Sequence, residues 1–160
     1  VLTLFKMLKK ENITTCIETN ASLKDTEKLI DAVDYMIADF KSPNKEILKS
    51  VTGADIEIIK ENLLKRALSQ KHLLIRIPLI NTFNTGEENA REFASFFKEL
   101  HDKSGSNEIY IEILTYHEYG KDKYKKENLE YNFSDGFVTQ NQVDILKTEL
   151  EKNNLKIIKT

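Results

Sequence analysis

Apolar residues along the chain alternate between two spacings. Segments with an apolar residue every three or four positions, typical of amphipathic helices, are each followed by a short and nearly continuous apolar run, typical of a buried strand. The pattern predicts helices at 2–12, 22–33, 43–51, 54–70 and 86–103, and strands at 13–19, 35–40, 73–80 and 109–114.

Hydroxyl residues and glycines mark the expected helix ends. A Ser or Thr before the first turn caps free N–H groups, most effectively with Glu or Gln three residues later, and glycine stops a helix. The sequence predicts a cap at Ser42 followed by Pro43, capping boxes at Thr85 with Glu88 and at Thr139 with Gln142, and stops at Gly53 and Gly105.

Near-continuous apolar strands separated by amphipathic helices predict a parallel sheet covered by helices, either doubly wound or part of a (βα) barrel. With 160 residues, 40% of them hydrophobic, the chain can bury one sizeable core. No repeat, low-complexity tract or flexible linker interrupts the pattern. We therefore expect a single α/β domain.

Charge and cysteine content exclude several classes of partner. The 24 basic and 26 acidic residues are interspersed, which argues against nucleic acid or an anionic membrane as a main partner. The apolar runs are too short to cross a bilayer and nothing resembles a signal peptide, so we expect a cytoplasmic protein. Cys16 is the single cysteine, so no internal disulfide and no local set of thiolates for zinc or an iron–sulfur cluster is available.

The helical pattern at the first residues lacks the residues that usually begin a helix. Val1, Leu2, Leu4, Phe5 and Leu8 fall at helical spacing, but neither an initiator Met nor a capping residue precedes them. We interpret the chain as a fragment of a longer protein, with a trimmed start of an otherwise complete protein as the alternative.

Polar or ionisable residues stand at or near the end of each predicted strand. Ligands of parallel α/β folds bind at the carboxyl edge of the sheet, so these residues are expected to converge on one place. They are Glu18 and Thr19 at the end of the first strand, Asp39 and Lys41 at the end of the second, Arg76 in the third and His117 after the fourth.

The first two pairs also have ordinary structural explanations. Glu18 can be a solvated turn residue, and Thr19 can cap the next helix. Asp39 and Lys41 stand two positions apart and share a strand face, which suits a structural ion pair.

Arg76 and His117 leave similar alternatives open. Arg76 interrupts an apolar strand and needs a partner, which can be a carboxylate of the protein or of a ligand. His117 can be an ordinary packed histidine. As a set, however, a carboxylate, a lysine, an arginine and a histidine on successive strand ends suit a zwitterionic ligand that contains ribose. The motifs GxSxG, P-loop, HExxH and GxGxxG are absent from the sequence.

Four segments carry a family resemblance: CIETNAS, IADFK, IRIPLINTFN and EILTYHEYGKDKY. In this order and at these intervals they resemble the later part of the activating enzymes of glycyl radical enzymes, in the radical S-adenosylmethionine superfamily. The resemblance covers essentially the whole chain, and TYHEYGKDKY is its most specific part. Thr115 departs from the usual Pro of the family, and NTFNT replaces the commoner Pro-Gly-Tyr-Asn-Asp loop, which leaves open the glycyl radical enzyme that is recognised.

The resemblance implies a fold and an incomplete cofactor site. Residues 1–160 would form the C-terminal part, about four parallel strands with their helices, of a partial (βα)6 TIM-like radical S-adenosylmethionine barrel. The CxxxCxxC motif that binds the [4Fe–4S] cluster in the family is missing, as is the Gly-Gly-Glu stretch that contacts the methionyl amine. The resemblance therefore assigns no catalytic and no metal-binding residue to this chain.

The resemblance also implies a cofactor-binding role for each strand-end residue. Glu18 and Thr19 would lie near the methionyl carboxylate, in some members through a monovalent cation, and Asp39 and Lys41 near the cation site and the ribose or carboxylate. Arg76 would face the methionyl carboxylate. His117 would lie near the ribose and adenine.

The implied function of the full-length parent is to use the [4Fe–4S] cluster and S-adenosylmethionine to generate a 5′-deoxyadenosyl radical and install a glycyl radical on a partner enzyme, pyruvate formate-lyase or a relative. Flavodoxin or ferredoxin would donate the electron. The 160-residue piece alone is expected to be inactive and to have little or no affinity for S-adenosylmethionine.

Two rival functions and one physical consequence complete the expectations. The rivals are another (βα)-barrel enzyme, for which no phosphate-binding glycine loop is visible, and a non-catalytic half-barrel that binds a protein. Without the first two barrel strands, the strand at 13–19 would present an unpaired edge, so the fragment is expected to self-associate through it.

Overall fold

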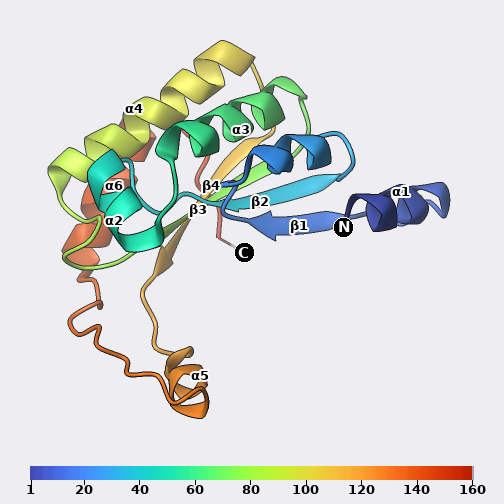
Figure 1. Cartoon of the computed structure of the whole chain (residues 1–160). Coiled ribbons are helices and arrows are strands. Elements are labelled where there is room, and N and C mark those ends of the chain that lie inside the picture. The colour runs from blue at the N-terminus through green and yellow to red at the C-terminus, as the bar shows by residue number, and fades with distance from the viewer. Residues whose placement is uncertain (160) are drawn as a thin grey trace.

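The computed structural model describes residues 1–159 and contains one parallel sheet (Figure 1). Its four strands lie in the order β1-β2-β3-β4, so each strand pairs with its neighbour in sequence. The strands are β1 (Cys16–Thr19), β2 (Tyr35–Asp39), β3 (Leu73–Leu79) and β4 (Ile109–Thr115). This confirms the predicted α/β class and the parallel sheet.

Helical segments connect the strands, and α3, α4 and the 3₁₀ helix η1 lie along one face of the sheet (Figure 1). The segment with α5 extends away from the sheet beyond β4. The helices are α1 (Leu2–Lys10), η1 (Lys24–Leu29), α2 (Lys45–Thr52), α3 (Ile56–Leu68), α4 (Glu87–Ser104), α5 (Lys121–Lys126) and α6 (Gln140–Lys152). None of the helices in residues 1–159 has the length and apolar character needed to span a membrane.

The core lies between the sheet and these helices. Successive strand residues point to opposite faces, and those of the covered face, such as Met36, Ala38 and Ile75, are at most 1% exposed. Phe40 continues this face beyond β2 and packs edge-on against Phe93 of α4, with ring centroids 5.8 Å apart. Burying side chains of this size contributes roughly 1.5–3 kcal/mol each, so this face anchors the fold.

A buried arginine joins α3 to the segment before β2. Arg66 is 0% exposed, and its guanidinium donates to the backbone carbonyls of Ile30, Val33, Asp34 and His72. The first three carbonyls belong to the segment between η1 and β2, and that of His72 lies directly before β3. A buried carbonyl without a donor costs roughly 1–3 kcal/mol. Arg66 therefore holds together three segments that are far apart in the sequence.

The two outer strands of the sheet differ. β1 pairs with β2 on one side and has no strand on the other side within the described residues. The outer side of β4 is partly covered, because Ile111 exchanges backbone hydrogen bonds of 2.8 Å with Lys156 and Ile158. The open edge predicted for the first strand is therefore present at β1.

Side chains from α3 also explain why the helix predicted at 22–33 is only a 3₁₀ helix over Lys24–Leu29. Asn62 donates to the carbonyls of Ala21 and Leu23 at 2.9 Å, and Arg66 takes carbonyls after η1. An α-helix over 22–33 would use the carbonyls of Ala21 and Leu23 for bonds to the N–H groups four positions later, whereas in the structure the Leu23 carbonyl accepts from the Thr26 N–H at 3.0 Å.

Two of the predicted helix caps are wrong. The Oδ1 of Asn44 caps α2 by accepting from the Ile47 N–H, while the Ser42 hydroxyl accepts from Asn44 in the preceding turn. At α4 the N-cap position is Gly86 with φ 95°, which separates Thr85 from the first turn, and no side chain caps this helix.

The remaining end signals are confirmed. Thr139 and Gln142 form a reciprocal capping box on α6, and Gly53 and Gly105 end α2 and α4 in the left-handed conformation. The strand predicted at 13–19 begins only at Cys16, and the short α5 was not predicted.

Candidate ligand site at the carboxyl edge of the sheet

The strand register brings three ionisable residues side by side. Asp39 of β2 stands opposite Arg76 of β3, which in turn stands opposite Glu112 of β4. Registered residues of neighbouring parallel strands point to the same face, here the one opposite to the buried Met36 and Ile75. The sheet therefore presents a charged row on the face that α4 does not cover.

Arg76 lies between two carboxylates. Its Nη1 is 2.7 Å from Oε1 of Glu18, and its Nε is 2.8 Å from Oε2 of Glu112. The side chain of Glu112 is 2% exposed, that of Arg76 20% and that of Glu18 67%. Burial alone would lower the pKa of Arg76, but the hydrogen bonds to Glu112 and Glu18 outweigh it and raise this pKa above its ordinary value.

A second ion pair lies at the end of β2. The Nζ of Lys41 is 2.8 Å from Oδ2 of Asp39, and both side chains are about a third exposed. Thr19, at the end of β1, accepts a hydrogen bond from the backbone N–H of Ala21 at 3.0 Å and so shapes the turn after the strand. Asp39 and Lys41 therefore form the structural ion pair considered for them, whereas Thr19 does not cap the next helix, whose N-cap position is Leu23.

His117 stands apart from these residues. It is exposed two positions beyond β4, its Nδ1 accepts from the backbone N–H of Tyr119 at 3.4 Å, and its ring stacks on that of Tyr119 with centroids 4.4 Å apart. Within residues 1–159, no hydrogen bond or ion pair connects His117 with Arg76 or Lys41. The structure places four of the six predicted residues at or just beyond the ends of β1 and β2, Arg76 in the middle of β3 within reach of Glu18, and His117 on the segment after β4.

Two buried polar residues of this edge were not predicted. Glu112 is one, and the second is Asn84, which is 1% exposed. Asn84 donates to the carbonyls of Lys41 at 2.7 Å and Pro78 at 2.8 Å, and accepts from the Ile80 N–H at 2.8 Å. It therefore fixes the backbone that carries Lys41 relative to the end of β3.

One of these residues had a signal in the sequence. Glu112 interrupts an apolar strand in the same way as Arg76, and a lone charge of opposite sign in the next buried strand is its natural partner. Asn84 gave no such signal, because an asparagine in a loop is most often a turn residue.

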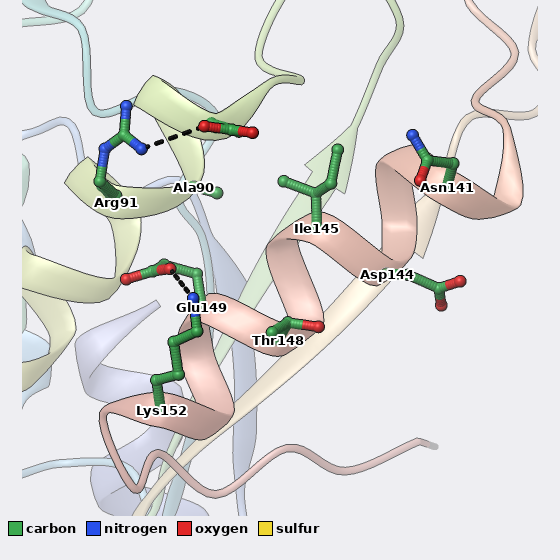
Figure 2. Close-up of a pocket in the computed structure, with 9 residues that line it drawn as sticks. Ala90, Arg91, Asn141, Asp144, Ile145, Thr148, Glu149 and Lys152 are labelled. Atoms are coloured by element: carbon green, nitrogen blue, oxygen red, sulfur yellow. Dashed lines mark hydrogen bonds and ion pairs between the residues drawn. The ribbon is translucent and has the colours of Figure 1, made fainter.

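One groove of the surface lies away from these residues. A groove of about 340 Å³ runs between α4 and α6, lined by Ala90, Arg91, Asp144, Thr148 and other residues (Figure 2). Its charged side chains are already paired within their own helices, as between Arg91 and Glu87 at 3.3 Å. No strand end contributes to it, so the groove does not belong to the candidate site. Residues 1–159 contain no group of three or more His, Cys, Asp or Glu side chains that could hold a metal ion.

Solved structures share this fold. The structure superposes with a TM-score of 0.75 and 18% identity on a crystallised domain of pyruvate-formate lyase-activating enzyme from Bacteroides vulgatus, covering 98% of this chain and 87% of that one. A radical S-adenosylmethionine methyltransferase from Sphaerobacter thermophilus gives a TM-score of 0.61 at 12% identity, over 92% of this chain and 41% of the other. The four parallel strands with their helices thus match the C-terminal part of the radical S-adenosylmethionine fold.

Sequence comparison narrows the class. The chain is 31% identical over 128 residues to 4-hydroxyphenylacetate decarboxylase activating enzyme of Clostridioides difficile strain 630, covering 78% of this chain and 39% of that protein. It is 28% identical over 131 residues to pyruvate formate-lyase 1-activating enzyme of Escherichia coli K12, covering 79% of this chain and 51% of the relative. The chain is a homologue of the activating enzymes of glycyl radical enzymes and spans 39–51% of the length of these two relatives. No protein-family profile matches it.

Proposed function

We propose that residues 1–160 form a single incomplete barrel domain, the C-terminal part of an enzyme that installs a glycyl radical on a partner protein. The supporting observation is the charged row of Asp39, Arg76 and Glu112 on the open face of the sheet, in register with the carboxyl end of β2, in a chain whose homologues are activating enzymes. In parallel α/β folds ligands bind at the carboxyl ends of the strands, where Asp39 stands.

The residues present fit one of the two cofactors of this chemistry. The charged and hydroxyl groups at the strand ends suit the carboxylate and ribose of S-adenosylmethionine, because guanidinium and ammonium groups bind carboxylates and carboxylates accept from hydroxyls. They do not fit a [4Fe–4S] cluster, because Cys16 at the start of β1 is the single thiol of the chain and a cluster needs several. We therefore assign the cluster ligands to residues outside this chain.

Each predicted residue receives a binding role in this proposal and none receives a catalytic one. Arg76 binds the methionyl carboxylate, and Asp39 with Lys41 binds the ribose or the carboxylate. Glu18 and Thr19 lie beside that carboxylate, where a monovalent cation can join them. His117 reaches the ribose and adenine through movement of the segment after β4, since it faces Tyr119 in this structure.

When bound, the cluster and S-adenosylmethionine supply a 5′-deoxyadenosyl radical that abstracts hydrogen from a glycine of the partner. The residues of this chain hold and orient the cofactor at the strand ends. The proposed partner is pyruvate formate-lyase or a related glycyl radical enzyme, and the proposed electron donor is a flavodoxin or ferredoxin. We place these reactions in the cytoplasm.

The test uses the complete reading frame of the source gene, reconstituted anaerobically with iron and sulfide, and compares it with its Arg76→Met variant. The expected product on the glycyl radical enzyme is a glycyl radical seen by electron paramagnetic resonance, together with 5′-deoxyadenosine. Loss of a charge-assisted hydrogen bond of roughly 1.5–3 kcal/mol predicts at least tenfold weaker cofactor binding by the variant. Arg91→Met, which removes an exposed arginine of α4, is the control. Unchanged cofactor affinity in Arg76→Met would contradict the assigned role.

The 160-residue chain gives a complementary test. A domain of nearly the same length and fold has been crystallised, which supports the chain folding without further segments. Calorimetric titration with S-adenosylmethionine is expected to show little or no binding, since the cluster is missing. Tight binding would show that the strand-end residues suffice.

We also propose that the chain self-associates through the open edge of β1, because unpaired strand edges pair with other chains. Light scattering is expected to show a mass that rises with concentration, and less so after Ile13→Lys, which places a charge beside the edge. A monomer at all concentrations would contradict this proposal.

A non-catalytic half-barrel that binds a protein is the second candidate. The absence of cluster ligands among residues 1–159 favours it. A complete reading frame without CxxxCxxC would make it the better account.

A further inference from the structure

We propose that Glu112 is a positioning residue for Arg76, and that Glu18 is its exchangeable partner. Glu112 holds the Nε of Arg76 permanently, while a ligand carboxylate replaces Glu18 on Nη1. The replacement by a cofactor carboxylate rests on the proposed function, whereas the different roles of the two glutamates follow from this chain alone.

Backbone geometry separates the two contacts. Glu112 stands directly opposite Arg76 on the neighbouring strand, so the sheet register itself brings the two side chains together. Glu18 lies on β1, where its register partner is Ile37, and β2 separates it from Arg76. Its carboxylate must cross two strand spacings, roughly 10 Å, which requires both side chains to be extended.

Burial separates them further. The Glu112 side chain is 2% exposed, and the Glu18 side chain is 67% exposed. Water and salt can replace Arg76 around Glu18 at little cost, since exposed ion pairs contribute little. At 2% exposure little water can reach Glu112 to take the place of the guanidinium, and breaking a buried ion pair is strongly disfavoured.

The charge of the residues around Arg76 favours the exchange of Glu18 for an incoming carboxylate. One guanidinium and two carboxylates give this cluster a net charge of −1, and the nearby Lys41 is paired with Asp39. A third carboxylate would be repelled by this negative charge. Departure of Glu18 removes the excess charge and exposes the Nη edge of Arg76, which can then form a bidentate contact with the incoming carboxylate.

The first experiment observes the Arg76 side chain of the isolated chain by ¹⁵N nuclear magnetic resonance, with Arg76→Lys to assign its signals. The Nε–H is expected to exchange slowly with solvent in the unmodified chain and in Glu18→Gln, and rapidly in Glu112→Gln, with partial recovery in Glu112→Asp. A merely structural role of Glu112 would not single out this one proton. Equal effects of the two Gln variants would overturn the assignment.

A measurement on the unmodified chain keeps the proposal testable if Glu112→Gln fails to fold. Added sodium chloride is expected to change the Nη signals of Arg76, because it screens the Glu18 contact, and to leave the slow exchange of Nε–H intact. Loss of both at the same salt concentration would show that the two contacts are equivalent.

The second experiment uses sodium acetate as the carboxylate probe, against sodium chloride of equal ionic strength. Acetate is expected to shift the Nη signals without affecting Nε–H, and to do so at severalfold lower concentration in Glu18→Gln, where the competing carboxylate is gone. A weaker response in Glu18→Gln, or no response in either protein, would overturn the exchange. Since no cofactor is involved, failure of the activating-enzyme function would leave this result standing.

Discussion

Two arginines show how differently the two regions of this molecule use the same side chain. Arg66 of α3 is fully buried and donates only to neutral backbone carbonyls, whereas Arg76, on the open face of the sheet, is a fifth exposed and binds two carboxylates. Burial lowers the pKa of Arg66, and the carboxylates raise that of Arg76.

The difference separates a structural from a functional use of charge. Every acceptor around Arg66 is part of the backbone, so no ligand can replace one without unfolding the segment. One of the acceptors of Arg76 is an exposed side chain that can move away. Arg66, on the covered side of the sheet, thus has fixed hydrogen-bond partners, whereas Arg76, on the open face, has one partner that a ligand can replace.

The largest effect is expected from Arg66→Met. This substitution removes the Arg66 donors from the carbonyls of Ile30, Val33 and Asp34, while that of His72 keeps the Met36 N–H at 3.2 Å, and it predicts a loss of roughly 3–6 kcal/mol in the free energy of unfolding. Urea denaturation measures it. The control Arg91→Met removes an exposed arginine paired with Glu87 and should change the stability by less than about 0.5 kcal/mol. A small effect of Arg66→Met would remove the contrast between the two arginines.

Asn84→Ala is expected to have a smaller effect than Arg66→Met. It removes two donors and one acceptor from a buried junction between the loop after β2 and the end of β3, at a cost of about 2–3 kcal/mol. The backbone N–H of Phe40, which donates to the carbonyl of Arg76 at 2.9 Å, should also exchange hydrogen faster, since the loop that follows it loses its anchor. Asn141→Ala, at an exposed position of α6, is the control. If the Phe40 N–H keeps its protection, Asn84 does not hold this loop.

Much of this arrangement was predictable from the sequence, because the apolar periodicity fixes strand faces. Glu18, Asp39 and Arg76 could be assigned to one edge from the strand pattern alone. The pairing of Arg76 with Glu112 depends on the register between β3 and β4, which no local pattern specifies. The role of Asn84 depends on contacts between residues 43 positions apart.

The incorrect prediction of a full helix at 22–33 has a similar cause. Residues 22–33 have a helical pattern, but Asn62 and Arg66 from a later helix capture carbonyls on both sides of η1. Local propensity predicted the helix, and tertiary hydrogen bonds shortened it to one 3₁₀ segment.

A smaller, pH-dependent effect is expected at the amino end of the open sheet face. His72 stacks on Tyr110 at 5.0 Å, its Nδ1 is buried without a hydrogen-bond partner in residues 1–159, and desolvation lowers its pKa below 6.5. A histidine with a lowered folded pKa favours folding while it is neutral. Its contribution is therefore complete above the unfolded pKa and declines as the pH falls through the folded value.

The nearby charges make this prediction specific. Glu108 acts to raise the pKa of His72, and Arg66 acts to lower it, but desolvation dominates. Denaturation midpoints should fall between pH 7 and pH 5 in the unmodified chain, and less in His72→Phe, which cannot be protonated. The same decline in both proteins would assign the effect to other groups.

The smallest effect on stability is expected from Glu18→Gln, which gives the most direct test of the difference between Arg66 and Arg76. An exposed ion pair contributes about 0–1 kcal/mol, and the change should vanish in high salt. Glu112→Gln, the same chemical change on the buried side of Arg76, should cost roughly 3–5 kcal/mol at any salt concentration, because it leaves Arg76 without its buried counter-charge. Urea denaturation of both variants at low and high salt measures the two values. If Glu18→Gln proves as costly as Glu112→Gln, both carboxylates are structural, and Arg76 resembles Arg66 more than its position at the strand ends suggests.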